Sequence, residues 1–440
     1  MVTAAPGRSK SAAVAPGDGD TGGMNSFSPF TDLDARITSI GRSFRVLGHL
    51  AWPESCKDVF LTHWRSGSPT LPEPDLSPID TAEQVAEIED LMRACDREHP
   101  IGDYLWKTAW SYATASRMLA SIGTPEFTEH SVALYGRPDV VYERQGLSVL
   151  DAADPIMEVT SELVSGGVVR SAEPTIPAEE FGVRLKAALD GFFTEDDVAV
   201  VIDPGMAAKA AAGSRRVKLR AGALFSDADF HQLLNHEALI HSLTLLNGRR
   251  QPLRALGLGS PRTTRTQEGL AVFSELATGS IDLPRLRRVA LRAQAVSKAL
   301  AGADFIEVFE HFLAEGQSED EAYHSAQRIF RGGDVRGGVA FTKDGAYLEG
   351  LILVQTFLRK AISDGREELI PHLFAGRMTL GDAVVLEELF GSGELVEPRY
   401  VPPWATGLSQ LAASLAYSLF SARIKLDVVE IARFVDLDAR

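Results

Sequence analysis

Residues 233–243 read LLNHEALIHSL, an apolar stretch that contains two histidines and a glutamate. His236 is followed directly by Glu237, and His241 lies five residues after His236. Ionisable side chains are costly to bury unless they have partners, so this stretch is a candidate functional site. The familiar zinc-binding pattern H-E-x-x-H places its histidines four residues apart. The longer spacing found here has to be reconciled with a helix before a metal site can be inferred.

The residues on either side predict one helix of about 20 residues. Ser226, with Asp229 three residues later, is a suitable start, and Asn247-Gly248 is a suitable end. On a regular α-helix, residues five apart lie about 140° apart around the axis, and residues four apart about 40°. One wider turn, a π-bulge, would absorb the additional residue. A shared metal therefore predicts a distortion of this helix between the two histidines.

A second helix, predicted over residues 266–279 between Thr266 as N-cap and Gly279, offers further ligands. Zinc binds imidazole nitrogens and carboxylate oxygens, so Glu268 is a suitable third ligand. Glu275 lies seven residues later on nearly the same face and is placed to orient a histidine. Glu268 and Glu275 also suit an ordinary solvated helix without any metal. The pattern H-E-x-x-x-H itself arises by chance in about one chain in a hundred of this length.

The sequence as a whole predicts an α+β fold that is mostly helical. Residues 1–28 are rich in Gly, Ala, Pro and Ser and predict a disordered tail. Residues 29–150 predict a helical lobe, with helices over 81–98 and 103–123. Residues 151–440 predict a core with C-terminal helices, and the strand-like runs 197–203 and 215–220 predict a small sheet beside the histidine helix. The glycines of residues 331–345 predict irregular backbone.

Composition limits the classes of function. The formal charge of −16 argues against a nucleic-acid partner, and no apolar run approaches the roughly 18 residues of a membrane span. The N-terminus lacks the continuous apolar core of a signal peptide. Two cysteines without a C-x-x-C pair suit a reducing compartment, so we expect a cytoplasmic protein. Its oligomeric state does not follow from the sequence.

Residues 209–265 carry ten basic and three acidic side chains, in contrast to the acidic whole. One interpretation is a solvated basic face. The other is a local positive field that attracts an anionic substrate.

Several motifs together resemble a known family, the bacterial flavohaemoglobin expression-modulating QEGLA-motif proteins, which are related to the microtubule-associated tyrosine carboxypeptidases. The motifs are IGTPEF (122–127), LYGRPD (134–139), NHEALIH (235–241), QEGLA (267–271), and FRGG through FTKDGAYLEG (330–350). The resemblance implies a zincin-like metallopeptidase with an extended histidine helix. The zinc ligands would be His236, His241 and Glu268, with Glu237 as the catalytic glutamate.

The implied activity is that of a zinc carboxypeptidase that removes an aromatic, tyrosine-like residue from the C-terminus of a peptide or protein. Zinc would activate water, and Glu237 would act as general base. The substrate carboxylate needs a cation, and the oxyanion needs a donor. The candidates for the carboxylate are Arg331, Arg336, Lys343, Arg262 and Arg265, and those for the oxyanion are Tyr323, His324 and Tyr347. Each of these side chains also suits an ordinary structural role.

Two other functions fit the same residues. One is a zinc endopeptidase or peptide-maturation protease. The other is a non-catalytic regulator that keeps a metal-binding fold, against which the intact Glu237 argues, since a scaffold needs ligands but no base. The sequence does not name the physiological substrate, and activity on tubulin does not follow from the resemblance.

Overall fold

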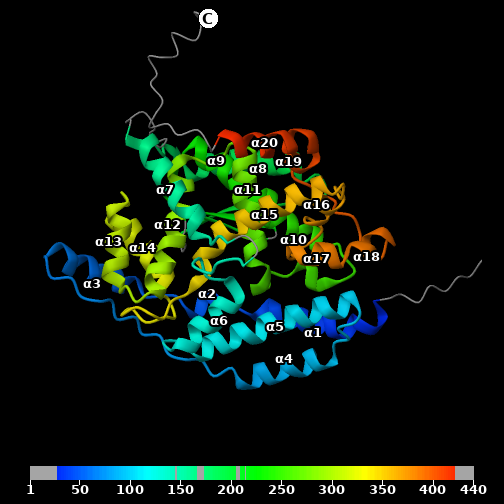
Figure 1. Ribbon diagram of the computed structural model, residues 1–440, viewed down its shortest axis with the longest axis horizontal. Helices are drawn as coiled ribbons and strands as arrows, with labels where there is room; N and C mark the ends of the chain where they lie inside the picture. Colours follow the sequence, from blue (N-terminus) through cyan, green and yellow to red (C-terminus); the bar gives the residue numbers. More distant parts are fainter. Residues whose placement is uncertain (1–26, 144–145, 166–172, 205–208, 214, 422–440) are drawn as a thin grey trace, which may run out of the picture.

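The computed structural model describes residues 27–143, 146–165, 173–204, 209–213 and 215–421. Helices form most of this part of the chain and two small sheets complete it, so the predicted α+β, mostly helical class is confirmed (Figure 1). The tail predicted over residues 1–28 lies outside the described residues except for its last two, of which Phe27 is buried. Among the described helices, none combines the length and the hydrophobicity that a membrane-spanning segment needs.

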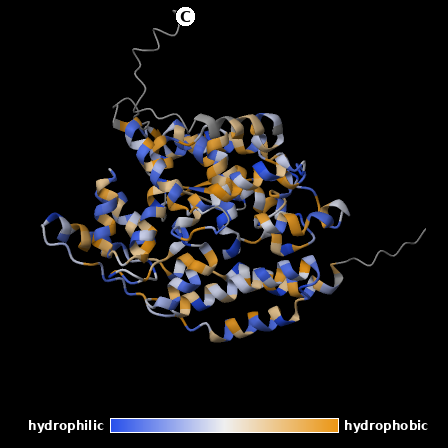
Figure 2. Cartoon of the chain, viewed as in Figure 1, coloured by the Kyte–Doolittle hydropathy of each residue, from blue (hydrophilic) through white to orange (hydrophobic). Residues whose placement is uncertain are grey.

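The first helices, apart from the third, pack against one another along one side of the molecule (Figure 1). Helix α4 is amphipathic and presents both hydrophobic and hydrophilic residues (Figure 2). The helices predicted over 81–98 and 103–123 correspond to α4 and α5. The helices are α1 (Thr31–Ser43), α2 (Val46–His49), α3 (Glu54–Arg65), α4 (Ala82–Ala94), α5 (Pro100–Ala120) and α6 (Pro125–Tyr135).

The hydrophobic core crosses the boundary expected near residue 150. One cluster of buried side chains extends from Phe27 to Leu415. Asp34 of α1 accepts hydrogen bonds of 2.8 Å from the backbone N–H groups of both Arg254 and Ala255. The N-terminal helices therefore form part of the framework that holds the later segments, and a separate N-terminal lobe stays a prediction.

A three-stranded sheet lies beside the histidine helix. Strand β2 (Ala199–Asp203) is parallel to β4 (Arg216–Arg220), and these are the two predicted strand-like runs. Strand β3 (Ala210–Ala212) is antiparallel to β4. Next to it, the Ser242 hydroxyl donates to the Gly213 carbonyl at 2.8 Å and ties the sheet to the helix.

A shorter pairing and one helix frame this sheet. Strand β1 (Ile176–Pro177) pairs antiparallel with β5 (Leu224–Phe225). Helix α8 (Ala178–Phe192) packs on β2 and β4, where Gly182 lies close to Val200 and Leu219.

The histidine helix is continuous but not regular. It consists of α9 (Asp227–Leu233), a π-helix labelled η2 (Leu234–Ser242) and α10 (Leu243–Gly248). The predicted distortion is confirmed, and it extends over nine residues rather than one turn. Ser226 and Asp229 form the predicted capping box.

The helix ends at Gly248, as predicted, but its C-cap is Arg249 and not Asn247 or Gly248. Asn247 is buried, and its side chain donates to the carbonyls of Phe374 and Tyr400 at 2.8 and 2.7 Å. Tertiary hydrogen bonds have thus taken the place of a local cap.

Helix α11 (Thr264–Ala277) begins earlier than the sequence suggested. The 3₁₀ turn Pro261–Thr263 starts it, so Thr266 is not the N-cap. The Thr266 hydroxyl instead accepts from the N–H of Leu380 at 3.3 Å. Gly279, with φ of 65°, follows the helix end as predicted.

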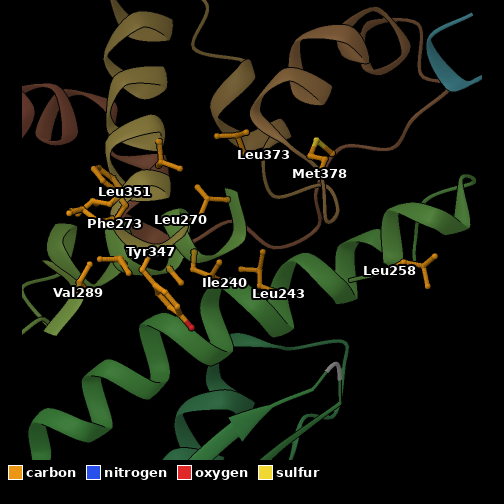
Figure 3. Packing of buried hydrophobic residues seen from close by; sticks show 14 of the residues in the cluster. Ile240, Leu243, Leu258, Leu270, Phe273, Val289, Tyr347, Leu351, Leu373 and Met378 are labelled. Atoms are coloured by element: carbon orange, nitrogen blue, oxygen red, sulfur yellow. The ribbon is translucent and has the colours of Figure 1, made fainter. Parts of the chain in front are cut away.

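Helices α11 and α15 (Ala346–Ser363) cross at two glycines. A Cβ atom on Gly269 would lie 2.3 Å from the Gly350 carbonyl group, and one on Gly350 would lie 2.1 Å from the carbonyl oxygen of Arg265. The backbones approach so closely that only glycine fits at either position. Around this crossing, Leu270 and Phe273 of α11 pack near Leu351 of α15 (Figure 3). The glycine of the QEGLA motif therefore sets the position of the helix that carries Glu268.

The later part of the chain adds an irregular segment and further helices. Glycines with positive φ, at positions 332, 337 and 338, give residues 331–345 the predicted irregular backbone, which ends in the 3₁₀ turn Thr342–Gly345. The helices are α7 (Leu150–Ser165), α12 (Leu283–Leu300), α13 (Phe305–Ala314), α14 (Glu319–Phe330), α16 (Leu369–His372), α17 (Leu380–Val385), α18 (Glu387–Gly391), α19 (Pro403–Thr406) and α20 (Leu408–Ser421).

Substituting Gly269 by alanine should lower the free energy of unfolding by roughly 1–3 kcal/mol, because the added methyl group forces α11 and α15 apart. The control is Gly191→Ala in α8, where a Cβ meets no atom within 4 Å. That substitution should stabilise by about 0.5–1 kcal/mol. Urea unfolding followed by circular dichroism measures both. Equal midpoints for the two variants would contradict the close approach.

Candidate metal centre

Three side chains from two elements converge on one point. His236 and His241 come from η2 and Glu268 from α11, and one ligand atom of each lies within 4.8 Å of the others. Oε2 of Glu268 is 3.7 Å from Nε2 of each histidine. A tetrahedral zinc with bonds of about 2.0–2.1 Å separates its ligands by about 3.4 Å. The group is therefore of the right composition and nearly the right size to hold such an ion.

Glu275 fixes the orientation of His236. Its Oε1 lies 2.6 Å from Nδ1 of His236, on the ring edge opposite Glu268. Glu275 is fully buried, and Arg285 donates to both of its oxygens at 3.1 and 3.2 Å. A carboxylate on one ring nitrogen sets the tautomer and leaves the other nitrogen to bind a metal. The contact agrees with the role expected for Glu275.

Lys343 fixes the orientation of Glu268 in a similar way. Its Nζ donates to Oε1 of Glu268 at 3.1 Å, so Oε2 is left to face the histidines. Burial raises the pKa of Glu268, but the charge of Lys343 and hydrogen bonds with His236 and His241 outweigh it and hold that pKa well below its usual range. Glu268 is therefore an ionised carboxylate, as a metal ligand has to be.

In the metal-free protein His236 is an imidazolium, with a proton on each ring nitrogen. Burial lowers the pKa of His236, but hydrogen bonds with Glu268 and Glu275 and the charge of Glu237 raise it to about 10. A metal ion binds neutral imidazole, so it must displace one of these protons.

Glu237 lies beside the three candidate ligands. Its Oε1 is 4.0 Å from Nε2 of His236, and its side chain is 22% exposed. Glu237 and His236 line one side of a cavity of about 190 Å³. Other residues that line it are Arg285, Arg292, Arg328 and Tyr347. A water molecule or substrate in this cavity is within reach of the Glu237 carboxylate.

Two of the side chains predicted to bind substrate are at this site. Lys343 contacts Glu268, and Tyr347 lines the cavity. Tyr347 also differs from the other two oxyanion candidates. Tyr323 is buried against Phe60 and Phe305, and His324 is exposed with its ring next to Gln327.

The four predicted arginines have other contacts. Arg262 forms a buried bidentate pair with Asp382 at 2.7 and 2.8 Å, and Arg265 donates to Glu349 at 2.8 Å. Arg336 is 79% exposed beside Asp334. Arg331 lies over the ring of Phe341, 5.2 Å from its centroid.

The sequence reasoning missed four arginines near the site. Arg285 and Arg292 are seven residues apart in α12, a spacing that places them on one helix face and was readable in advance. Arg328 pairs with Asp344 at 2.6 and 2.7 Å. Arg377 follows α16 and donates to the carbonyl of His241 at 3.1 Å, a contact for which the sequence offered no signal.

The distant motifs that carried the family resemblance meet around this site. Glu349, just before Gly350 in α15, accepts hydrogen bonds of 2.8 Å from Arg265 and Tyr142. The same carboxylate packs on Gly136 of LYGRPD, where a Cβ would lie 2.3 Å from its Oε2. In IGTPEF, the Gly123 N–H donates to the Gly332 carbonyl of FRGG at 2.9 Å. The motifs form one connected framework behind the candidate ligands.

Comparison with known proteins agrees with this framework. The family model described as "Microtubule-associated tyrosine carboxypeptidase" matches residues 59–423, which include every residue of the site. No curated protein matches the chain. One similar solved structure, the "putative lipoprotein from Colwellia psychrerythraea", is 14% identical with a TM-score of 0.37. That match covers 83% of this chain and 66% of the other, just under two thirds of its length.

Replacing Glu275 by glutamine should weaken zinc binding about 10- to 100-fold, because the carboxylate that orients His236 loses its charge. Competition with a chromogenic chelator measures the affinity. Glu310→Gln, which changes an exposed carboxylate of α13, is the control and should leave the affinity unchanged. Equal affinities for the two variants would show that Glu275 plays no part in metal binding.

Zinc affinity should also rise with pH. The pKa of His236 is raised to about 10 in the metal-free fold, so its proton competes with zinc at every pH below that value. For one displaced proton the apparent affinity rises up to tenfold per pH unit, from pH 6.5 to 8.5. The same raised pKa stabilises the metal-free fold fully below the unfolded value of about 6.5, and this contribution is lost as pH rises through 10. Zinc titrations at several pH values test the claim, and a flat profile would contradict it.

Proposed function

The chain belongs to the microtubule-associated tyrosine carboxypeptidase family, and on that premise we propose that it is a zinc metallocarboxypeptidase. Family membership implies a carboxypeptidase-like function on a peptide or protein. The observation that carries the zinc-dependent form of the proposal is the group of His236, His241 and Glu268, with Glu237 beside His236 in one cavity. The residue released would be aromatic and tyrosine-like, as the name of the family suggests.

The roles of the residues follow from their positions. His236, His241 and Glu268 would hold the zinc, which when bound supplies a Lewis acid that acidifies water and polarises a carbonyl group. Glu237 is the base: it takes a proton from the attacking water and delivers it to the leaving amine. The oxygen of water bonds to the scissile carbonyl carbon and the C–N bond breaks. The products are a shortened peptide with a new carboxylate and a free amino acid.

Tyr347 is the proposed donor to the oxyanion that develops during this attack. This residue is 9% exposed and lines the same cavity as Glu237. Three cations lie near that ring: Arg285, Arg292 and Lys343 are 5.9, 5.5 and 5.3 Å from its centroid. Nearby positive charge favours a hydroxyl that donates toward developing negative charge.

The cavity also bears on the direction of attack. Its volume of about 190 Å³ is below the roughly 300–1,000 Å³ of pockets for drug-sized ligands. Such a space suits one terminal residue better than a long internal segment. A scaffold without catalysis would need no carboxylate at position 237.

Incubation of the zinc-loaded protein with peptides that vary at the last residue tests the proposal, with products identified by mass spectrometry. We expect loss of single C-terminal residues, fastest for aromatic ones. Internal cuts would establish the endopeptidase alternative, and an absence of products would favour the regulator.

Glu237→Gln keeps the size of the side chain but removes the base. We expect this variant to bind zinc as the wild type does and to lose at least a hundredfold in kcat, within the range of general base catalysis. Zinc content and turnover are measured on the same sample. Loss of zinc together with activity would instead make Glu237 a ligand.

A further inference from the structure

The cavity beside the candidate metal group has an excess of positive charge. Three cations of this region each hold a carboxylate at hydrogen-bond distance. Arg285 binds Glu275, Arg328 binds Asp344, and Lys343 binds Glu268, with distances between 2.6 and 3.2 Å.

Arg292, which lines the cavity, differs from these three cations. Its Nε is 3.6 Å from Oδ2 of Asp344, beyond hydrogen-bond range, while Arg328 takes both oxygens of that carboxylate. The Nε atom is buried and has no hydrogen-bond partner. A buried guanidinium donor without a partner is costly, and the cost disappears when an anion binds to it.

The position of Arg292 suits one particular anion. Arg292 lines the same cavity as Glu237 and His236, on α12 rather than on the histidine helix. When the last peptide bond of a substrate lies at Glu237, the terminal carboxylate of that substrate is only one residue away from the bond. The small volume of the cavity matches that separation. A carboxylate also matches the planar fork of a guanidinium group.

We propose that Arg292 binds the C-terminal carboxylate of the substrate and thereby selects the last peptide bond for cleavage. This inference rests on the proposed carboxypeptidase function and adds to it the specificity-determining residue. It also replaces the arginines expected from the sequence, since Arg262, Arg265 and Arg336 pair with carboxylates and Arg331 is not among the residues that line the cavity.

The environment of Arg292 agrees with this role. Burial and the neighbouring charge of Arg328 lower the pKa of Arg292 to about 10. The surroundings therefore disfavour the positive charge of Arg292, and a bound carboxylate would stabilise it.

The test compares one peptide as free acid and as C-terminal amide, and the readout is the ratio of the two kcat/KM values. For the wild type we expect a ratio of at least ten, because one charge-assisted contact is lost with the amide. For Arg292→Met and Arg292→Gln we expect a ratio near one, through loss of activity on the acid only. A variant that is merely distorted loses activity on both peptides and keeps the ratio.

The matched control is Arg331→Met, which removes another arginine whose Nε is buried without a partner. Its ratio should stay at the wild-type value. Should the Arg292 variants turn over too slowly, the same ratio is measured as binding of acid and amide in Glu237→Gln protein with and without Arg292→Gln.

The outcomes separate this inference from the proposed function. A wild-type preference for the acid that persists in the Arg292 variants overturns the inference and leaves the carboxypeptidase intact. A ratio that collapses in Arg331→Met as well overturns the assignment to Arg292. A wild type that cuts acid and amide equally well overturns the proposed function.

Discussion

Two histidines five residues apart cannot face one ion from a regular α-helix, and the π-helix Leu234–Ser242 removes this conflict. The wider turn is held from several sides. The Ser242 hydroxyl ties it to the sheet, Arg377 donates to the His241 carbonyl, and Ile240 packs in the core (Figure 3). Tertiary packing therefore maintains a helical form that is rare on its own. Glu268 can face both histidines, and Glu275 can contact His236 from the other side of its ring, because this turn places the two imidazoles together.

A second constraint is the burial of charge. Glu275, Glu268 and Asp344 are ionised groups within the fold, and each is matched by a cation from another element. Breaking such a pair leaves an uncompensated buried charge, which costs about 3–5 kcal/mol. Five of the ten basic side chains of residues 209–265 are paired with carboxylates as well. Lys209, Lys218, Arg250, Arg262 and Arg265 all pair with carboxylates, four of which lie outside that segment.

Local patterns predicted much of this protein. The helix around His236, its capping box, the wider turn and strands β2 and β4 all follow from spacing and propensity. Glu268 and Glu275 follow from the next helix. The substrate-binding cations did not, because an arginine in a sequence carries no sign of whether a distant carboxylate will neutralise it. Asp382 meets Arg262 and Asp344 meets Arg328 only in the folded chain. Thr266 and Asn247 were predicted to cap helices but instead form hydrogen bonds with residues far away in the sequence, which local patterns do not reveal.

X-ray absorption at the zinc edge of the zinc-loaded protein tests the proposed metal site without relying on activity, because it reports the ligands of the metal itself. We expect one zinc per chain with two imidazole nitrogens at about 2.0–2.1 Å and carboxylate or water oxygens completing four ligands. In His241→Ala, one imidazole should disappear from the spectrum. A site with a single imidazole, with sulfur ligands, or unchanged by that substitution would contradict it.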